Sequence, residues 1–349
     1  MTLIELEQKF AAAMPSERLA GRPARELLEA GRAWSEAVWS DAEQSGPMPL
    51  DAAAIAHGLD VAARPVFVCG VHRSGTTLVR DLLDDHPELM VLPAEGTYFT
   101  SFERRLSRLG EGPEALTFFG CEWLRRVANP INQPPYWLLG RTSPAGSPYV
   151  RFARALMAWW PMTWPLAAAA IAFADARSGG VSESVSRWVE KTPLNEQFLP
   201  RLRQRFPEAK FIQVIRHPEA VLVSRKRMEQ NASGSFRNLR QVLRDLDTSY
   251  RIAAEENDDG ESGRFLLLRY EDLVSARSRT AVRLARFLDV AVTPGLQSPT
   301  VAGMPAGRNT SFPEASARSA LTDEERLRLH AAVGDSAASV GYDVAVSRR

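Results

Sequence analysis

A stretch that combines glycine, hydroxyl side chains and one arginine runs from Gly70 to Thr77 (Gly-Val-His-Arg-Ser-Gly-Thr-Thr), directly after a short apolar run. A turn between a strand and a helix points free backbone N–H groups, and the positive end of the helix, at an anion. Gly75 lets the backbone approach a ligand closely. Thr76 and Thr77 add hydroxyl donors, and Arg73 adds a cation. The segment therefore predicts a phosphate-binding turn, with an ordinary Gly/Ser turn before a helix as the alternative.

This turn nearly matches the loop of nucleotide triphosphatases, Gly-x-x-x-x-Gly-Lys-Ser/Thr. The lysine of that loop is absent, because Thr76 occupies its position. Since that lysine normally reaches the β- and γ-phosphates, hydrolysis of ATP or GTP is disfavoured.

A second candidate anion site begins at Arg216, which follows the apolar run 210–215. Ser224 lies eight residues further on, in an expected helix. The arginine fork suits phosphate oxygens, and the serine adds a hydroxyl. Ligands bind at the carboxyl ends of parallel strands, and both candidate sites follow expected strands. Two separate anion sites fit a nucleotide with phosphates on its 5′ and 3′ sides; the alternative is an exposed arginine at a strand end.

A third candidate is Lys191, at the end of the expected strand 187–190 and one of only four lysines in the chain. A single ammonium group at a strand end is suited to act as a catalytic point charge. The alternative is a solvated surface lysine.

The element pattern predicts an α/β fold in which a parallel sheet is covered by helices on both faces. The expected strands are 65–69, 89–92, 187–190, 210–215 and 264–269. The expected helices between and after them are 76–85, 195–206, 218–229, 236–256 and 279–288. Residues 1–60 are predicted to form an N-terminal helical appendage, and residues 61–349 a single domain. Residues 96–180 contain no convincing strand and are expected to be a helical insertion.

Composition limits the other possibilities. The chain has 349 residues and a net charge of +1, so nothing global indicates a nucleic-acid partner or an anionic membrane. Its two cysteines, Cys69 and Cys121, cannot form a disulfide framework, and its histidines show no metal-ligand spacing, so no metal is expected. The N-terminus lacks an apolar secretory region, which favours the cytoplasm.

An uncharged stretch covers residues 155–174 and is interrupted by Pro161 and Pro165. It is long enough to cross a bilayer, but length alone is a weak signal. Buried or cleft-lining helices are expected, with a membrane-associated segment as the alternative.

Taken together, these segments resemble the sulfotransferase family that uses 3′-phosphoadenosine-5′-phosphosulfate (PAPS), over about residues 64 to 290. Arg73-Ser74-Gly75-Thr76-Thr77 is similar to the family's 5′-phosphosulfate loop, and Arg216 with Ser224 is similar to its 3′-phosphate site. Leu268-Arg-Tyr-Glu-Asp-Leu273 resembles a late strand and helix, where the tyrosine that matches Tyr270 lies near the adenosine. The resemblance implies the three-layer fold of P-loop nucleotide triphosphatases and PAPS as co-substrate.

Within the family, Gly70 to Arg80 followed by His86-Pro87 is most similar to tyrosylprotein sulfotransferases and their bacterial relatives. Those enzymes use a glutamate soon after the His-Pro pair as the catalytic base. Glu95 is the matching residue here, at a spacing one residue longer. The histidine that cytosolic sulfotransferases place after their lysine and threonine is missing, because Pro193 follows Lys191-Thr192.

The resemblance thus implies a mechanism in which Arg73 and Lys191 stabilise the negative charge on the leaving oxygen and Glu95 takes the acceptor's proton. His72 is the next candidate base. Aromatic residues are frequent in the insertion and suit an apolar or aromatic small-molecule acceptor, although core packing explains each of them equally well. The acceptor and the oligomeric state stay open. A P-loop kinase or nucleotide triphosphatase and a non-catalytic nucleotide-binding module are the alternative functions.

Overall fold

The computed structural model describes residues 1–15, 25–130, 135–141, 147–258, 263–305 and 320–344. The chain forms two compact units. The first unit comprises Met1–Pro65, Asp84–Glu190 and Thr300–Met304, and the second comprises Val66–Leu83, Lys191–Pro299 and Pro305–Arg349. Each unit therefore consists of segments that are distant in the sequence.

A five-stranded sheet has the strand order β2-β3-β1-β4-β5. The strands are β1 (Pro65–Cys69), β2 (Leu89–Val91), β3 (Arg187–Lys191), β4 (Lys210–Ile215) and β5 (Phe265–Arg269). β4 pairs in parallel with both β1 and β5, and β3 pairs in parallel with β2. The predicted strands are confirmed to within two residues at their ends, and with them the parallel α/β fold.

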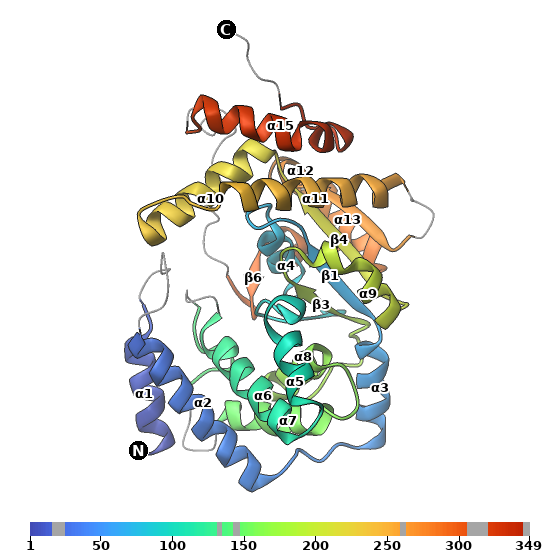
Figure 1. Ribbon diagram of the computed structural model, residues 1–349. Coiled ribbons are helices and arrows are strands. Elements are labelled where there is room, and N and C mark those ends of the chain that lie inside the picture. The colour runs from blue at the N-terminus through green and yellow to red at the C-terminus, as the bar shows by residue number, and fades with distance from the viewer. Residues whose placement is uncertain (16–24, 131–134, 142–146, 259–262, 306–319, 345–349) are drawn as a thin grey trace. The chain divides into compact units, whose positions relative to one another are not determined.

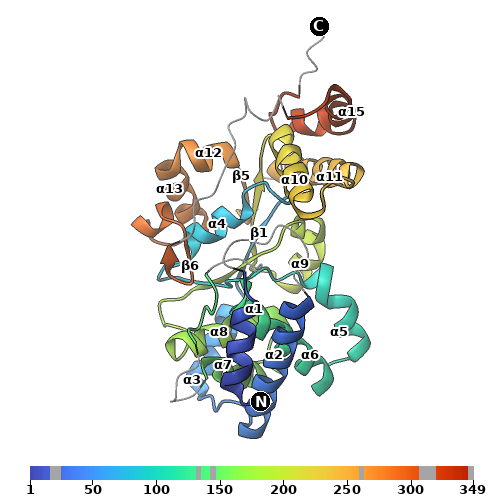
Figure 2. The ribbon, with the colours of Figure 1, turned by 90° about the vertical axis from the view of Figure 1, so that its left-hand side faces the viewer.

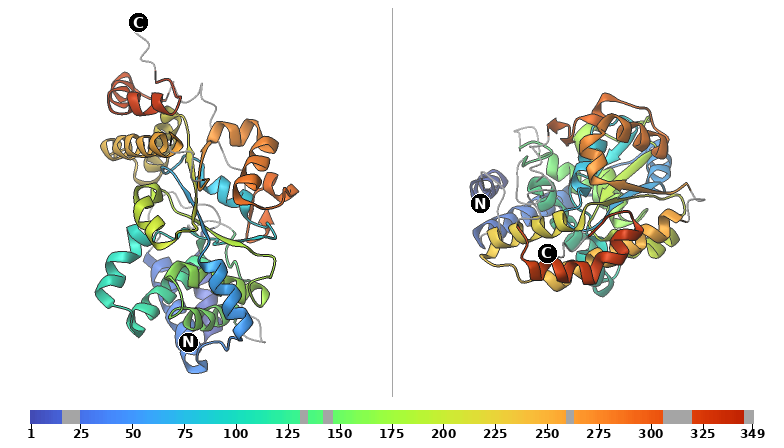
Figure 3. Two further views of the ribbon diagram at one scale, coloured as in Figure 1. Left: turned by 90° about the vertical axis from the view of Figure 1, so that its right-hand side faces the viewer. Right: turned by 90° about the horizontal axis from the view of Figure 1, so that it is seen from above.

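The second unit has three layers (Figures 2 and 3). One face of β1, β4 and β5 carries α4 (Thr76–Leu83), α12 (Tyr270–Ser275) and α13 (Arg277–Leu288). The other face carries α9 (Leu199–Arg205), α10 (Pro218–Ser233) and α11 (Leu239–Asp258). Short 3₁₀ helices, η3 (Asn195–Phe198) and η4 (Pro294–Gln297), precede α9 and follow α13.

β1 and β4 are largely apolar because both their faces are covered. Every residue of β1 and of β4 is buried, and the rings of Phe67 and Phe211 stack with centroids 5.6 Å apart. β5 alternates between buried and partly exposed residues, as expected of a strand at the sheet edge.

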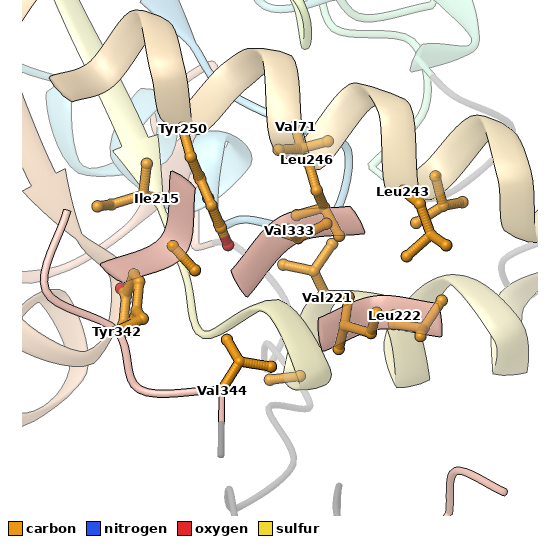
Figure 4. Packing of buried hydrophobic residues seen from close by; sticks show 14 of the residues in the cluster. Val71, Ile215, Val221, Leu222, Leu243, Leu246, Tyr250, Val333, Tyr342 and Val344 are labelled. Carbon is orange, nitrogen blue, oxygen red and sulfur yellow. The ribbon is translucent and has the colours of Figure 1, made fainter. Parts of the chain in front are cut away.

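A last helix, α15 (Asp323–Ser339), packs against α10 and α11. The hydrophobic cluster between them continues into the segment that follows α15 (Figure 4). Its labelled members are Val71, Ile215, Val221, Leu222, Leu243, Leu246, Tyr250, Val333, Tyr342 and Val344. The end of the described chain is thereby fixed to the helical layer of the second unit.

The first unit is helical apart from β2, most of β3 and the short segment Thr300–Met304 (Figure 1). Its helices are α1 (Leu3–Ala13), α2 (Arg25–Ser45), α3 (Ala52–Ala62), α5 (Glu103–Leu109), α6 (Pro113–Ala128), α7 (Pro148–Trp159) and α8 (Pro165–Ser178), with a π-helix, η1 (Tyr98–Phe102). α2 packs against α1, α6 and α7. An aromatic core of Phe10, Trp34, Trp137 and Tyr149 joins α1, α2 and α7 through edge and tilted ring contacts.

The uncharged stretch 155–174 is divided between α7, which ends at Trp159, and α8, which begins at Pro165. Most of its side chains are buried, as expected for core helices. None of the helices in the described ranges is long and apolar enough to cross a membrane. A two-residue pairing of β6 (Thr300–Val301) with β7 (Met304–Pro305) completes the secondary structure.

Candidate active site

The turn between β1 and α4 depends on three residues with positive φ. Gly70, Arg73 and Gly75 have φ values of 133°, 76° and 109°. The Ser74 N–H donates to the Val71 carbonyl at 3.1 Å, and the Leu78 N–H to the Gly75 carbonyl at 3.0 Å. These bonds close the turn and start α4 at Thr76, as the sequence predicts.

Two of these positions also lack room for a side chain. A Cβ on Gly75 would lie 2.3 Å from Cδ2 of Tyr270, and one on Gly70 would lie 2.2 Å from the Val214 carbonyl oxygen. Glycine is therefore required both by the backbone conformation and by the packing of β4 and Tyr270 against the turn.

The base of the turn is tied to the segment that follows Lys191. The Gly70 N–H donates to Oε2 of Glu196 at 2.8 Å, and the Leu194 N–H donates to the Gly70 carbonyl at 3.0 Å. Burial raises the pKa of the Glu196 carboxyl. Sequence reasoning missed Glu196, since a glutamate early in a helix carries no signal of a partner in a distant turn.

The two predicted anion sites meet in the second unit. Nε of Arg73 donates to the Ser224 hydroxyl at 2.9 Å, and Nη1 of Arg216 donates to the Arg73 carbonyl at 3.2 Å. The guanidinium carbon of Arg216 lies 4.3 Å from the centroid of the Tyr270 ring. Arg73, Arg216, Ser224 and Tyr270, which the sequence separates by up to 197 positions, thus form one polar cluster at the carboxyl ends of β1, β4 and β5.

Burial keeps the Tyr270 hydroxyl protonated beside the charged Arg216. Burial raises the pKa of Tyr270, and the adjacent charge of Arg216 lowers it only in part. Its ring is therefore an uncharged face beside the Arg216 guanidinium, available for cation–π and stacking contacts.

The remaining loop residues lie at different depths. The Ser74 hydroxyl is buried, with no hydrogen-bond partner among the residues whose positions are described. Thr76 is buried at the first position of α4, and Thr77 is half-buried. Lys191 ends β3 with a fully buried side chain, which excludes the alternative of a solvated surface lysine.

Glu95 belongs to the first unit, in the segment after β2. Its carbonyl accepts from the Arg126 guanidinium, which also donates to the Thr97 hydroxyl at 2.9 Å. The next N–H, of Gly96, donates to Oε1 of the buried Glu190 at 2.9 Å. A Cβ on Gly96 would lie 2.5 Å from that same oxygen. The backbone around Glu95 is therefore fixed from both sides, while its side chain is half-buried.

Arg126 and Glu190 were not predicted. Burial lowers the pKa of Arg126, and the charges of Glu122, Glu95 and Glu190 oppose this effect. The guanidinium carbon also lies 4.6 Å from the Phe102 ring centroid. Nothing in the sequence links α6 to the segment after β2, so only the fold could show that Arg126 supports Glu95.

Directly after Glu95, the π-helix η1 presents half-buried aromatic side chains. The ring centroids of Tyr98 and Trp164 lie 4.4 Å apart, and those of Phe99 and Trp164 lie 6.4 Å apart. π-Helical turns occur frequently at functional sites. Trp159, in contrast, is a core residue whose Nε1 donates to Asp175 Oδ2 at 2.7 Å.

Within the described part of the chain, no group of three or more His, Cys, Asp or Glu side chains could hold a metal ion.

Comparisons with known proteins identify the family and the fold. The sulfotransferase family model matches residues 65–294. The sulfotransferase domain of the olefin synthase from Synechococcus PCC 7002 has a similar fold, with 22% identity, a TM-score of 0.50, and coverage of 80% of this chain and 95% of that domain. Sulfotransferase STF9 from Mycobacterium avium is 15% identical over 97% of this chain and 90% of that chain, with a TM-score of 0.47. No curated protein sequence gives a significant match.

Proposed function

Because the chain belongs to the sulfotransferase family, it transfers a sulfuryl group from PAPS to an acceptor, and we propose which residues carry out each part of this reaction. The observation that carries the proposal is the meeting of Arg73, Arg216, Ser224 and Tyr270 beside the β1–α4 turn. A nucleotide with a phosphate on each side of its ribose needs two anion sites, and the cluster offers both.

The donor binds with its 5′-phosphosulfate at the turn and its 3′-phosphate at Arg216 and Ser224. Backbone N–H groups of the turn, together with the positive end of the α4 dipole, attract the negative charge of the donor's 5′-phosphosulfate. The forked guanidinium of Arg216 supplies charge-assisted hydrogen bonds to the 3′-phosphate. Tyr270 provides an apolar face for the adenosine.

In the transfer step, the acceptor oxygen or nitrogen attacks sulfur while the bond from sulfur to the bridging phosphate oxygen breaks. The electron pair of that bond leaves with 3′-phosphoadenosine 5′-phosphate (PAP). Arg73 and the buried Lys191 stabilise the charge that develops on the leaving oxygen, because positive charge is worth most where water is excluded. The acceptor proton passes to the Glu95 carboxylate.

The surroundings of Glu95 support its role as the base. Arg126 and Glu190 hold the backbone on either side of it, so the carboxylate is carried on a fixed segment. A base that is already held in position needs less reorganisation to reach the transition state, which lowers the activation free energy.

We infer an acceptor of small-molecule or natural-product class whose hydroxyl or amine is carried on an apolar or aromatic scaffold. The π-helix η1 begins three residues after Glu95, and its Tyr98 and Phe99 lie against Trp164. Half-buried aromatic rings favour flat apolar ligands. Cytoplasmic location stays a prediction from the sequence.

A transfer assay with labelled PAPS tests the function. The chain is incubated with phenols, aliphatic alcohols and amines in the presence of a chelator, and products are read by mass spectrometry. We expect transfer without added magnesium and, with no acceptor, slow release of sulfate. Magnesium-dependent release of phosphate from ATP would instead indicate a phosphotransferase. Tight PAP binding without transfer or sulfate release would indicate a non-catalytic nucleotide-binding module.

A further inference from the structure

The segment after α15, residues 340–344, is called the C-terminal strap here, and it reaches the carboxyl ends of β4 and β5. The Tyr342 hydroxyl donates to Oε2 of Glu271 at 2.7 Å. Nη1 of Arg269 donates to the Gly341 carbonyl at 3.3 Å, and Nε2 of His217 lies 3.3 Å from the Asp343 carbonyl. The strap therefore contacts the residues that flank Arg216 and Tyr270.

Glu271 connects the strap to Arg216. Its second carboxylate oxygen, Oε1, accepts from the His217 N–H at 2.9 Å. The Tyr250 hydroxyl donates to the Arg216 carbonyl. That carbonyl and that N–H belong to a single peptide group, so both of its polar atoms are held by side chains. The backbone torsions that direct the Arg216 side chain are consequently fixed at the end of β4.

The Tyr342 hydroxyl stays protonated and can therefore donate its hydrogen bond to Glu271. Burial, together with the charge of Glu271, raises the pKa of Tyr342 far above its usual range. The hydroxyl therefore keeps its proton at any physiological pH. The Tyr342 ring packs edge-on against His217, with centroids 5.6 Å apart, and lies under the guanidinium of Arg269 at 4.9 Å.

Other contacts hold α15 in place without this hydroxyl. Nζ of Lys226 lies 2.8 Å from Oε2 of Glu325. Leu329 and Val333 of α15 are buried in the hydrophobic cluster with α10 and α11, and Val333 is labelled in Figure 4. Removing one hydroxyl oxygen from Tyr342 should therefore leave the helix docked and the ring in its place.

We propose that Tyr342 is a positioning residue for recognition of the 3′-phosphate, acting through Glu271 on the peptide group between Arg216 and His217. The inference rests on the proposed function, in which Arg216 binds that phosphate. The C-terminal strap would then contribute to the selectivity for 3′-phosphorylated nucleotides, in addition to the residues at the strand ends.

The test compares the dissociation constants of PAP and of AMP, which lacks the 3′-phosphate, by calorimetry on the full chain. Tyr342→Phe should raise the dissociation constant of PAP by about 3- to 10-fold, which is the scale of one hydrogen bond, and should leave that of AMP unchanged. Tyr136→Phe is the matched control, since its hydroxyl donates to the Pro15 carbonyl in the first unit, and it should change neither constant. Thermal unfolding of both variants separates positioning from loss of stability.

A double-mutant cycle sharpens the test. If Tyr342 acts through Arg216, Tyr342→Phe should have no further effect on PAP binding in the Arg216→Ala background. Equal weakening of PAP and AMP, an unchanged PAP constant, or full additivity with Arg216→Ala would each overturn the inference. If the wild-type chain itself binds PAP and AMP equally, the proposed 3′-phosphate site is wrong and the inference falls with it.

Discussion

The strand-end cluster of the second unit and the aromatic region around η1 in the first unit use different kinds of residue. The cluster consists of two arginines, a serine and a tyrosine joined by hydrogen bonds and a cation–π contact, and it lies beside a turn whose glycines have positive φ. The region around η1 consists of aromatic rings whose contacts resemble those of the neighbouring core.

The difference shows which sites can be found from sequence. A buried arginine is costly unless a ligand or a specific contact compensates its charge, and a positive-φ backbone position is accessible at low cost only to glycine, so these residues indicate function. Aromatic side chains stabilise cores and bind ligands through the same burial of apolar area. Trp159 and Trp164 illustrate this, because both lie in the uncharged stretch but have different surroundings.

The largest expected effect concerns Glu95 in the first unit. Glu95→Gln removes the proposed base and should lower kcat by about 10²- to 10⁴-fold, with PAP affinity nearly unchanged. Turnover is measured at saturating donor and acceptor, under conditions where chemistry limits the rate. Glu114→Gln, at an exposed position of α6, serves as the control. Turnover within a few-fold of wild type would exclude Glu95 and make His72 the next candidate.

The two tryptophans should separate packing from acceptor binding. Trp159→Ala opens a cavity beside Gly58 and leaves Asp175 without its donor, so unfolding free energy should fall by about 3–5 kcal/mol. Trp164→Ala should raise the KM for the acceptor, with a smaller loss of stability and unchanged PAP affinity. Denaturant titration and steady-state kinetics measure the two effects. The acceptor assignment fails if both variants lose stability alike and neither changes the acceptor KM.

Arg216→Ala tests the strand-end cluster. Loss of the charge-assisted hydrogen bonds of the Arg216 guanidinium should weaken PAP binding by about 1.5–3 kcal/mol, or roughly 10- to 150-fold. AMP binding should be weakened much less. Calorimetry gives both constants. Arg240→Ala, at an exposed position of α11 in the same unit, should leave both unchanged. Equal losses of affinity for PAP and AMP would show that Arg216 does not bind the 3′-phosphate.

The smallest effect is expected at Ser224. Ser224→Ala removes the acceptor of the Arg73 hydrogen bond and a proposed donor to the 3′-phosphate, and should cost PAP binding about 0.5–1.5 kcal/mol. Val223→Ala, a buried neighbour on the same helix, controls for packing losses in α10. A larger effect from Val223→Ala than from Ser224→Ala on PAP affinity, at equal stability, would count against a direct role for the hydroxyl.

Much of the fold followed from local patterns. The apolar runs at 65–69 and 210–215 predicted strands, because strands buried on both faces have little polar surface to expose. The β1–α4 turn and the strand-end position of Arg216 followed from residue type and spacing, since a phosphate-binding turn needs glycine and a helix start in fixed order. The role of Glu95 came from a family resemblance and stays a prediction.

Tertiary structure alone decided the supporting contacts. Glu196 beneath Gly70, Arg126 and Glu190 beside Glu95, and Tyr250 and Tyr342 near Arg216 are joined to their partners across long stretches of chain. Their residue types are ordinary, and their partners have no fixed spacing in the sequence. A hydrogen bond between distant segments depends on where the packed helices place both ends, and local sequence determines only one end at a time.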